Sequence, residues 1–425
     1  MVYTIMQCHL SMTARRSNVI VKNSAIHKLS PFKSLSTEQG KLKIKIEDFC
    51  KSHIQAETNK PAIFTIHGDA GTGKSVVLSQ LFNDIQTAAR TDSTSPLFDT
   101  TNIFLVNHPE ILKVYKELAG QLPNLRKKDF DRPTSFINRS HKNGHHSDIV
   151  IIDEAHLLLS KPDRYNNFDQ QNQLLEIIKL AKVVVLVFDT HQVLKTKSFW
   201  NEQRLQHLIA PYPHADYQLH QQFRMHANQA VVDWIDNLTA RRLTPVPANT
   251  KDFELHIFDD AQAMYDRIKQ DDQRVGLSRI VATSGYPSRL DGGKHYVTEG
   301  RFKLPWDQYN YQATSWAEKP ETINEVGSIY TVQGFDLNYV GVILGPPFDY
   351  DPITQHMIVN TDRVTDPEVF KRRDDLTDPQ EIQQIKEQLT LNVLNVLMKR
   401  GVYGLYIYAS QPALRQRLLE LTSSK

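Results

Sequence analysis

Short runs of apolar and β-branched residues recur along the chain, and turn-forming residues bound each run. Four of these runs lie in the first half of the chain, at residues 62–66, 102–106, 148–152 and 183–188. Each has the length of a β-strand, and helical periodicity appears between them, for example over residues 76–88 and 170–180. Strands that alternate with helices predict a parallel sheet that is covered on both faces.

A second set of such runs follows, at residues 278–283, 340–345 and 404–409. The stretch 209–217, which contains two prolines, separates the two sets. We therefore predict two α/β domains in tandem. The expected divisions are an N-terminal segment 1–60, a first domain 61–212 and a second domain 213–425, with room for a small insertion at 245–320.

The glycine-rich sequence GDAGTGKS, residues 68–75, stands between the first predicted strand and the first predicted helix. In that context G-x-x-x-x-G-K-S predicts a phosphate-binding loop, because glycines let backbone N–H groups turn toward phosphate oxygens. Lys74 would contact the β- and γ-phosphates, and Ser75 would offer its hydroxyl to Mg²⁺. An incidental glycine-rich turn is the alternative. The residues predicted to bind the nucleotide here are Gly68, Gly71, Thr72, Gly73, Lys74 and Ser75.

A second signal is DIVIIDEAH, residues 148–156, in which a strand of the buried type runs into Asp153 and Glu154. The carboxyl ends of parallel strands form the ligand edge of a sheet. We expect Asp153 to hold Mg²⁺ together with Ser75, and Glu154 to activate the attacking water. A solvated acidic turn is the alternative for the pair. His156 would either bridge to the second domain or serve a structural role.

Three short motifs flank these two signals. LSTEQ ends at Gln39, DTHQ ends at Gln192 after a predicted strand, and QQFRM contains Arg224. They resemble the L-x-x-x-Q, D-x-x-Q and L-x-x-x-[YF]-R motifs of superfamily 1 helicases. The resemblance implies that Gln39 reads the adenine edge, Gln192 senses the γ-phosphate and Arg224 acts as an arginine finger. A helix cap formed by Ser36 or Thr37 is the alternative for the first motif.

The last motifs fall in the predicted second domain. YTVQGFD contains Gln333 and Gly334, which the resemblance places at the nucleotide, and VLMKR ends at Arg400, a second arginine finger. The narrower resemblance is to a prokaryotic P-loop ATPase domain family of unknown function, related to schlafen-type helicase-like domains. It implies a P-loop NTPase fold of two tandem RecA-like domains, with ATP and Mg²⁺ in the cleft between them. Two positions depart from the superfamily pattern, Lys399 in place of Thr and Asp336 in place of Glu.

Charge limits the partners that the chain as a whole could bind. The formal net charge is +2 and the sequence pI about 8.3, so a nucleic-acid site would have to be a local patch. One candidate is the basic run 125–130, for which a solvated loop is the alternative. A second candidate is a set of aromatic residues that could stack on bases or cover a small core: Trp306, Tyr309, Tyr311 and Trp316.

Two cysteines, Cys8 and Cys50, have no partners at metal-binding spacing and predict free thiols in a reducing compartment. No apolar run approaches the roughly 18 residues of a membrane span, and the first residues do not resemble a signal peptide. We therefore expect a cytoplasmic protein without membrane contact.

These features predict an ATPase, a superfamily 1 helicase-like NTP hydrolase, coupled to single-stranded DNA or RNA. The alternative is a nucleotide-gated switch or remodelling ATPase that binds protein partners without translocating, because a fold does not fix a function. Stimulation of ATP hydrolysis by nucleic acid would separate the two.

Overall fold

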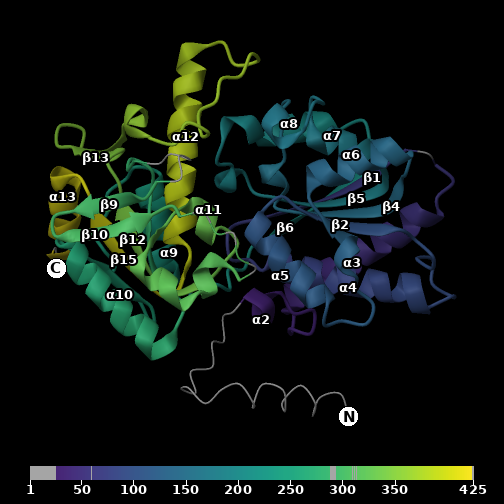
Figure 1. Cartoon of the computed structure of the whole chain (residues 1–425), viewed down its shortest axis with the longest axis horizontal. Coiled ribbons are helices and arrows are strands. Elements are labelled where there is room, and N and C mark those ends of the chain that lie inside the picture. The colour runs from purple at the N-terminus through teal and green to yellow at the C-terminus, as the bar shows by residue number, and fades with distance from the viewer. Residues whose placement is uncertain are drawn as a thin grey trace.

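The computed structural model describes residues 25–58, 60–287, 293–308, 310, 312 and 314–423. The chain folds into two α/β halves that lie side by side, each built on its own sheet (Figure 1). The predicted fold class is confirmed: this is a P-loop NTPase fold of two tandem RecA-like domains.

The first sheet has six strands in the order β3-β2-β4-β5-β1-β6, and all of its pairings are parallel. Its central strands are the apolar runs that the sequence predicted: β2 has the predicted bounds, and β1, β4 and β5 are each two residues longer. The strands are β1 (Ala62–Gly68), β2 (Asn102–Val106), β3 (Phe130–Asp131), β4 (Ser147–Asp153), β5 (Ala181–Phe188) and β6 (His214–Leu219).

Helices cover both faces of this sheet, because successive side chains of a strand point to opposite sides. In β5, Val183 and Val185 belong to the cluster that contains residues of α3, α4 and α5, whereas Val184 and Leu186 belong to a second cluster with α6, α7 and α8. These helices are α3 (Thr37–Gln55), α4 (Lys74–Thr91), α5 (Pro109–Ala119), α6 (Pro133–Asn143), α7 (Gln173–Lys179) and α8 (Glu202–Ile209).

The second sheet has seven strands in the order β7-β15-β12-β8-β11-β10-β9, and only its edge pair β9–β10 is antiparallel among the described strands. A separate hairpin, β13–β14, lies beside it. The strands are β7 (Glu254–Ile257), β8 (Ser278–Ala282), β9 (His295–Glu299), β10 (Phe302–Trp306), β11 (Val326–Gly327), β12 (Leu337–Leu344), β13 (Phe348–Asp351), β14 (His356–Val359) and β15 (Gly401–Ala409).

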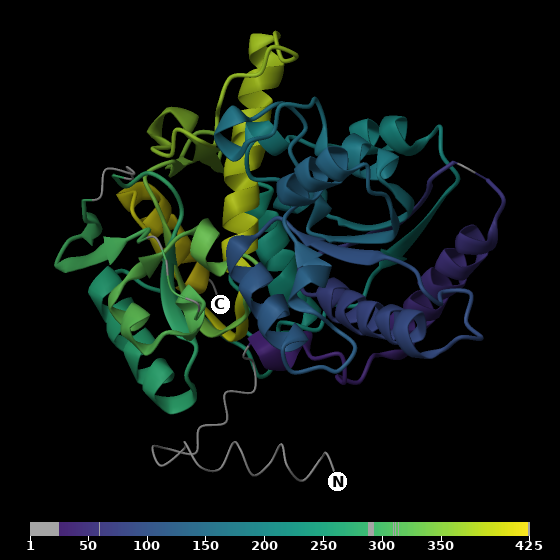
Figure 2. The same ribbon diagram turned by 45° about the vertical axis from the view of Figure 1, so that its right-hand side comes forward.

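Helix α12 (Pro379–Met398) connects the two halves and stands between them in both ribbon views (Figures 1 and 2). Its Ile385 and Leu389 join the apolar cluster on the α6–α8 face of the first sheet, while Leu394 and Leu397 pack with the second sheet. The remaining helices are α2 (Ala25–Leu29), α9 (Gln229–Thr239), α10 (Ala261–Val275), α11 (Ile329–Val332) and α13 (Pro412–Ser423).

Two predicted divisions need correction. Strand β6, residues 214–219, pairs with β1 in the first sheet, so the first domain continues past residue 212. The interval 245–320 is largely not an insertion, because it supplies strands of the second sheet itself. Strand β8 is an inner strand, β7 forms one edge, and the β9–β10 hairpin extends the other edge. Short strands with mixed polarity, such as β6 and β7, give a weak periodic signal, and sheet pairing alone reveals them.

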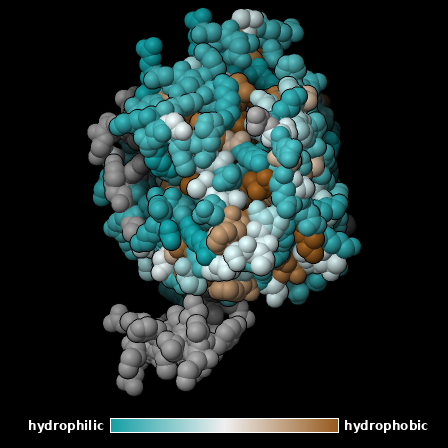
Figure 3. Space-filling model, turned by 90° about the vertical axis from the view of Figure 1, so that its right-hand side faces the viewer, coloured by the Kyte–Doolittle hydropathy of each residue, from teal (hydrophilic) through white to brown (hydrophobic). Residues whose placement is uncertain are grey.

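No helix within the described ranges is long and apolar enough to cross a membrane. The face of the first domain in Figure 3 is mainly hydrophilic, with hydrophobic residues in small separate groups. Cys50 is a buried free thiol on α3, and burial raises its pKa to about 12. Cys8 lies outside the described residues.

Candidate nucleotide-binding site

The glycine-rich loop turns between the end of β1 and the start of α4. Gly71 and Gly73 have φ angles of 93° and 82°, in the left-handed region that favours glycine. A Cβ at Gly71 would lie 2.9 Å from the Cβ of Arg224, and one at Gly73 would lie 2.3 Å from Gln39 Nε2. The loop therefore needs glycine at both positions for its backbone angles and for the close approach of its neighbours.

Lys74 is the first residue of α4, and its side chain turns back into the loop. Its Nζ donates to the carbonyl oxygens of Gly68 and, at 2.8 Å, of Asp69. It also lies 3.6 Å from Asp189 Oδ2. A buried ammonium group at a helix N-terminus, beside a turn of backbone N–H groups, is the arrangement that attracts phosphate.

Asp153 ends β4 and lies next to the loop, as parallel strand order predicts. Its Oδ1 accepts a hydrogen bond from Ser75 Oγ at 3.2 Å, and its Oδ2 accepts one from Tyr115 OH at 3.0 Å. Burial and the neighbouring charge of Glu154 raise the pKa of Asp153 to about 7. No sequence motif marks Tyr115, which occupies an ordinary apolar position of α5.

Glu154 follows at once and has a left-handed backbone, with φ 56° and ψ 48°. This conformation is uncommon for residues other than glycine and directs the carboxylate into the cavity, which Glu154 lines. His156 Nε2 lies 3.1 Å from Glu154 Oε2 without the alignment of a hydrogen bond. His156 is fully buried, and burial lowers the pKa of its imidazole. Its close contact is with Glu154 in the first domain, which favours the structural role over a bridge.

The strand end after β5 supplies the third polar group. Asp189 Oδ2 accepts a hydrogen bond from Gln192 Nε2 at 2.6 Å, and Asp189 Oδ1 accepts one from the backbone N–H of His191 at 3.0 Å. Gln192 is buried and lines the same cavity as the loop. Asp69, Asp189 and His191 also place ligand-type atoms within 4.8 Å of one another, although Asp69 and His191 are exposed.

Arg224 forms the opposite wall of the cavity, just after β6. Its Nε donates to Asp336 Oδ1 at 2.5 Å, and the backbone N–H of Phe223 donates to Gly71 O at 2.9 Å. Although burial acts in the other direction, the charges of Lys28 and Arg224 hold the pKa of Asp336 well below its usual range. The Asp336 carboxylate that departs from the superfamily pattern is therefore paired with the predicted arginine finger.

Of the two predicted fingers, only Arg224 is among the described residues that line the cavity. Arg400 is 1% exposed, and its guanidinium donates to the carbonyl oxygens of Val396 at 2.9 Å and Phe335 at 3.3 Å. Burial lowers its pKa to about 9, and the charge of Arg224 acts in the same direction. Arg400 is thus a buried cation close behind Arg224.

Gln333 and Gly334 are also not among the described residues that line the cavity. Gln333 is buried, and its Nε2 has no hydrogen-bond partner in the described part of the chain. Gly334 has φ 86°, and a Cβ there would lie 2.6 Å from the side chain of Ile111 on α5. Gly334 therefore marks a place where the second domain closely approaches the first.

Gln39 takes part in the cap of α3 and also contacts the glycine-rich loop. Ser36 caps α3 in a capping box, in which Gln39 Oε1 accepts from the backbone N–H of Ser36 at 3.0 Å. The other end of the amide, Nε2, donates to Thr72 O of the loop at 3.1 Å. The helix cap is present, and it fixes Gln39 in the cavity wall.

These residues enclose a cavity of about 390 Å³, within the range of small-molecule sites. Its lining combines the loop, the acidic strand end, Arg224 and a stretch of the N-terminal segment. The lining residues are Lys28, Lys33, Ser34, Leu35, Ser36, Gln39, Ala70, Gly71, Gly73, Lys74, Ser75, Val76, Glu154, Gln192, Phe223, Arg224 and Asp336.

Of the aromatic candidates for base stacking, the two tryptophans are buried. Trp306 and Trp316 are 4% and 2% exposed, and their indole N–H groups donate to Pro287 O and Glu325 Oε2. The core-covering alternative is therefore correct for both. Tyr309 and Tyr311 lie outside the described residues.

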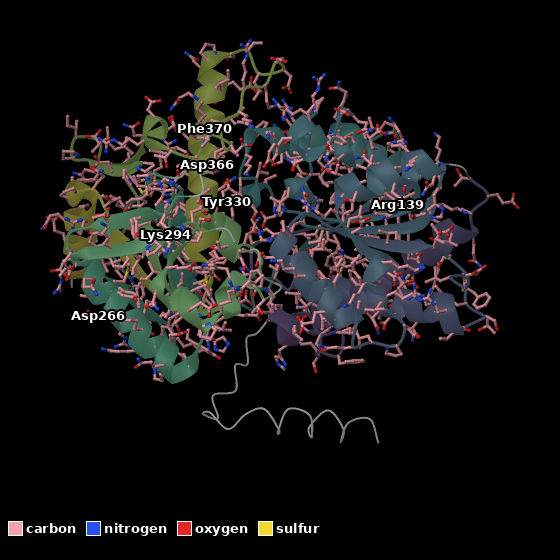
Figure 4. The ribbon with its side chains drawn as sticks, in the orientation of Figure 1. Arg139, Asp266, Lys294, Tyr330, Asp366 and Phe370 are labelled. Atoms are coloured by element: carbon pink, nitrogen blue, oxygen red, sulfur yellow. The ribbon has the colours of Figure 1, made fainter. Side chains whose placement is uncertain are left out.

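The basic run 125–130 is partly exposed. Arg126, Lys127 and Lys128 are exposed on the far side of the first domain, near the edge strand β3. Arg139, in the same half of that domain, pairs with Asp131 at 2.5 Å (Figure 4). This surface is separate from the cavity and remains compatible with a solvated loop.

The two RecA-like sheets and the site between them define a helicase-like nucleotide-binding fold. A family model described as Schlafen group 3, DNA/RNA helicase domain, matches residues 61–411, and the chain belongs to this family. The chain is also 39% identical to the uncharacterized protein YPL245W of Saccharomyces cerevisiae, over 95% of this chain and 94% of that protein. The family model confirms the schlafen part of the expected resemblance. The expectation of a prokaryotic family has no support, because this relative is a yeast protein.

Two helicases are among the solved structures that match this chain. The Pif1 helicase from Candida albicans is 12% identical and has a TM-score of 0.35, covering 91% of this chain and 97% of that one. The Mycobacterium smegmatis helicase Lhr, in a structure with ssDNA and AMP-PNP, is 10% identical with a TM-score of 0.36, covering 92% of this chain and 50% of that one.

Proposed function

We propose that this protein hydrolyses ATP with Mg²⁺ in the cleft between its two domains. One observation carries the proposal: Lys74, Ser75 and Glu154 line one wall of a single cavity whose other wall contains Arg224. Phosphoryl transfer depends on positioning and on charge stabilisation, and these are the group types that supply both.

The residues fit a magnesium ion on the evidence of their own contacts. Ser75 Oγ and Asp153 Oδ1 are 3.2 Å apart, and Mg²⁺ prefers such oxygen ligands. The raised pKa of Asp153 indicates a buried carboxylate that lacks sufficient positive charge nearby. When bound, the ion would supply that charge and neutralise phosphate oxygens.

The remaining roles follow from position. Lys74 would exchange its bonds to loop carbonyls for phosphate oxygens, and Glu154 would orient the attacking water and accept its proton. Arg224 would exchange Asp336 for the γ-phosphate and stabilise the charge that develops there. Arg400, behind it, would keep the local potential positive.

Coupling to single-stranded DNA or RNA is the second part of the proposal, and membership of a DNA/RNA helicase domain family supports it. The test is the ATP hydrolysis rate of the purified chain, with and without each polymer, at two salt concentrations. We expect stimulation of several-fold that weakens at higher salt, and a Glu154→Gln variant that binds ATP without turnover. No hydrolysis above the Glu154→Gln background would refute the ATPase assignment.

A specific observation also supports the alternative of a switch that does not translocate. Residues 366–376 of the second domain are held on their own side by Tyr330, whose hydroxyl donates to Asp366 at 2.5 Å (Figure 4). On the other side, Arg373 donates to Ser160 Oγ at 2.7 Å and Thr196 O at 2.8 Å in the first domain. Contacts that tie residues 366–376 to both domains restrict domain movement. ATP hydrolysis without stimulation by either polymer would therefore favour the switch.

A further inference from the structure

Helix α2 lies between the two domains and before the residues that match the family model. Both ribbon views place it at the boundary of the two halves (Figures 1 and 2). Ser79 Oγ of α4 donates to Leu29 O, which ties α2 to the first domain. The backbone N–H of Ala25 donates to Glu318 Oε1 at 2.9 Å, which ties α2 to the second.

Lys28 is the residue of α2 that reaches the nucleotide cavity. Its side chain is 16% exposed and lines the cavity, and its Nζ donates to Gly334 O at 3.1 Å and Asp336 Oδ1 at 2.9 Å. The same Asp336 oxygen accepts the hydrogen bond from Arg224 Nε at 2.5 Å. Two partly buried cations therefore share one carboxylate oxygen at the cavity wall.

The described lining of the cavity has more basic than acidic side chains. Its described lining contains four basic side chains, Lys28, Lys33, Lys74 and Arg224, but only the two carboxylates Glu154 and Asp336. Burial lowers the pKa of Lys28 to about 8, although Asp336 acts against this shift. A buried cation that shares its only carboxylate is better satisfied by a polyanion.

We propose that Lys28 is a further nucleotide-binding residue, whose ammonium group moves from Asp336 to the triphosphate when ATP binds. The proposal rests on the function proposed above and assigns part of that site to a segment outside residues 61–411. Its consequence is that the N-terminal segment completes the nucleotide site in this chain.

The test is ATP affinity, measured by calorimetry on the full chain with the Lys28→Gln, Lys28→Met and Lys28→Arg variants. Gln keeps a hydrogen-bond donor for Gly334 O and Asp336 but removes the charge. The Gln variant therefore still tests the proposal if the Met variant does not fold. We expect Gln and Met to weaken ATP binding about tenfold or more, and Arg to stay within about threefold. Lys41→Met, an exposed lysine on α3, is the matched control and should change nothing.

The Asp336→Asn variant should change ATP affinity in the opposite direction to the Lys28 variants. Removal of this carboxylate frees both Lys28 and Arg224 for phosphate, so ATP binding should tighten more in the parental chain than in the Lys28→Gln background. A purely structural role predicts lower melting temperatures in the Lys28 variants with ATP affinity unchanged, and that result would overturn the proposal. If the parental chain binds no ATP, the proposed function falls as well, and the two failures are thereby distinguished.

Discussion

Asn392 of α12 donates from its side-chain amide to the main-chain carbonyl of Val193, across the domain boundary, at 2.8 Å. The same amide donates to Thr190 O at 3.1 Å, so it holds both ends of the turn that carries Gln192. Asn392 is 3% exposed and is anchored in turn by Gln388, whose amide donates to its Oδ1 at 2.8 Å. Helix α12 ends two residues before Arg400, so one rigid element joins the turn and the second arginine.

We predict that Asn392→Leu lowers the turnover number for ATP roughly ten- to hundredfold and leaves the affinity for ATP within about threefold. The physical reason is that Gln192 loses its fixed position while the phosphate loop keeps its own contacts. Steady-state kinetics with separate kcat and KM measure the effect. Gln384→Ala, at an exposed position of the same helix, is the control, and an equal loss of turnover there would argue against a role for the bonds to the turn.

Arg224→Ala should reduce the turnover number by about 10³-fold or more, because an arginine finger stabilises charge that develops only during phosphoryl transfer. ATP affinity should change much less. Single-turnover hydrolysis and equilibrium binding provide the two readouts, with Arg242→Ala as an exposed control nearby in sequence. Full ATPase activity in the Arg224 variant would contradict the assignment.

The stability of the chain should depend on pH through Asp336. Its pKa in the folded state is held well below the value of about 3.9 expected when unfolded, mainly by Lys28 and Arg224 against the effect of burial. A depressed pKa of this kind stabilises the fold above about pH 4, and the contribution is lost as the pH falls further. Between pH 5 and about pH 3, the melting temperature should therefore fall more steeply in the parental chain than in Asp336→Asn. Asp252→Asn, at an exposed position, should follow the parental chain.

Arg373→Met should destabilise the fold by about 2–4 kcal/mol, because Ser160 and the carbonyl of Thr196 lose buried hydrogen bonds to a charged donor. Urea unfolding measures the change. Arg372→Met is a matched control, since that side chain is 92% exposed and pairs only loosely with Asp374 at 3.8 Å. Equal stability of the two variants would show that residues 366–376 do not hold the domains together.

The sequence by itself determined the parts of the site that are local. GDAGTGKS and DIVIID could be interpreted because a strand, a tight turn and a helix start are encoded by adjacent residues, and apolar strands buried on both faces leave a continuous pattern. The same locality made a helix cap at Ser36 the alternative for the motif that ends at Gln39, and that cap is present. The positions of Lys74, Ser75 and Asp153 therefore follow from motif and strand order alone.

Only the tertiary structure decided which distant residues meet. Lys28 and Asp336, Tyr115 and Asp153, and Asn392 and Val193 are separated by 308, 38 and 199 residues, and no local pattern marks them as partners. Polar contacts of this kind depend on how separate elements and the two domains pack, and the periodicity of single elements carries no information about that placement. The burial of Trp306 and Trp316 was decided in the same way, because an aromatic residue suits a surface or a core until its neighbours are known.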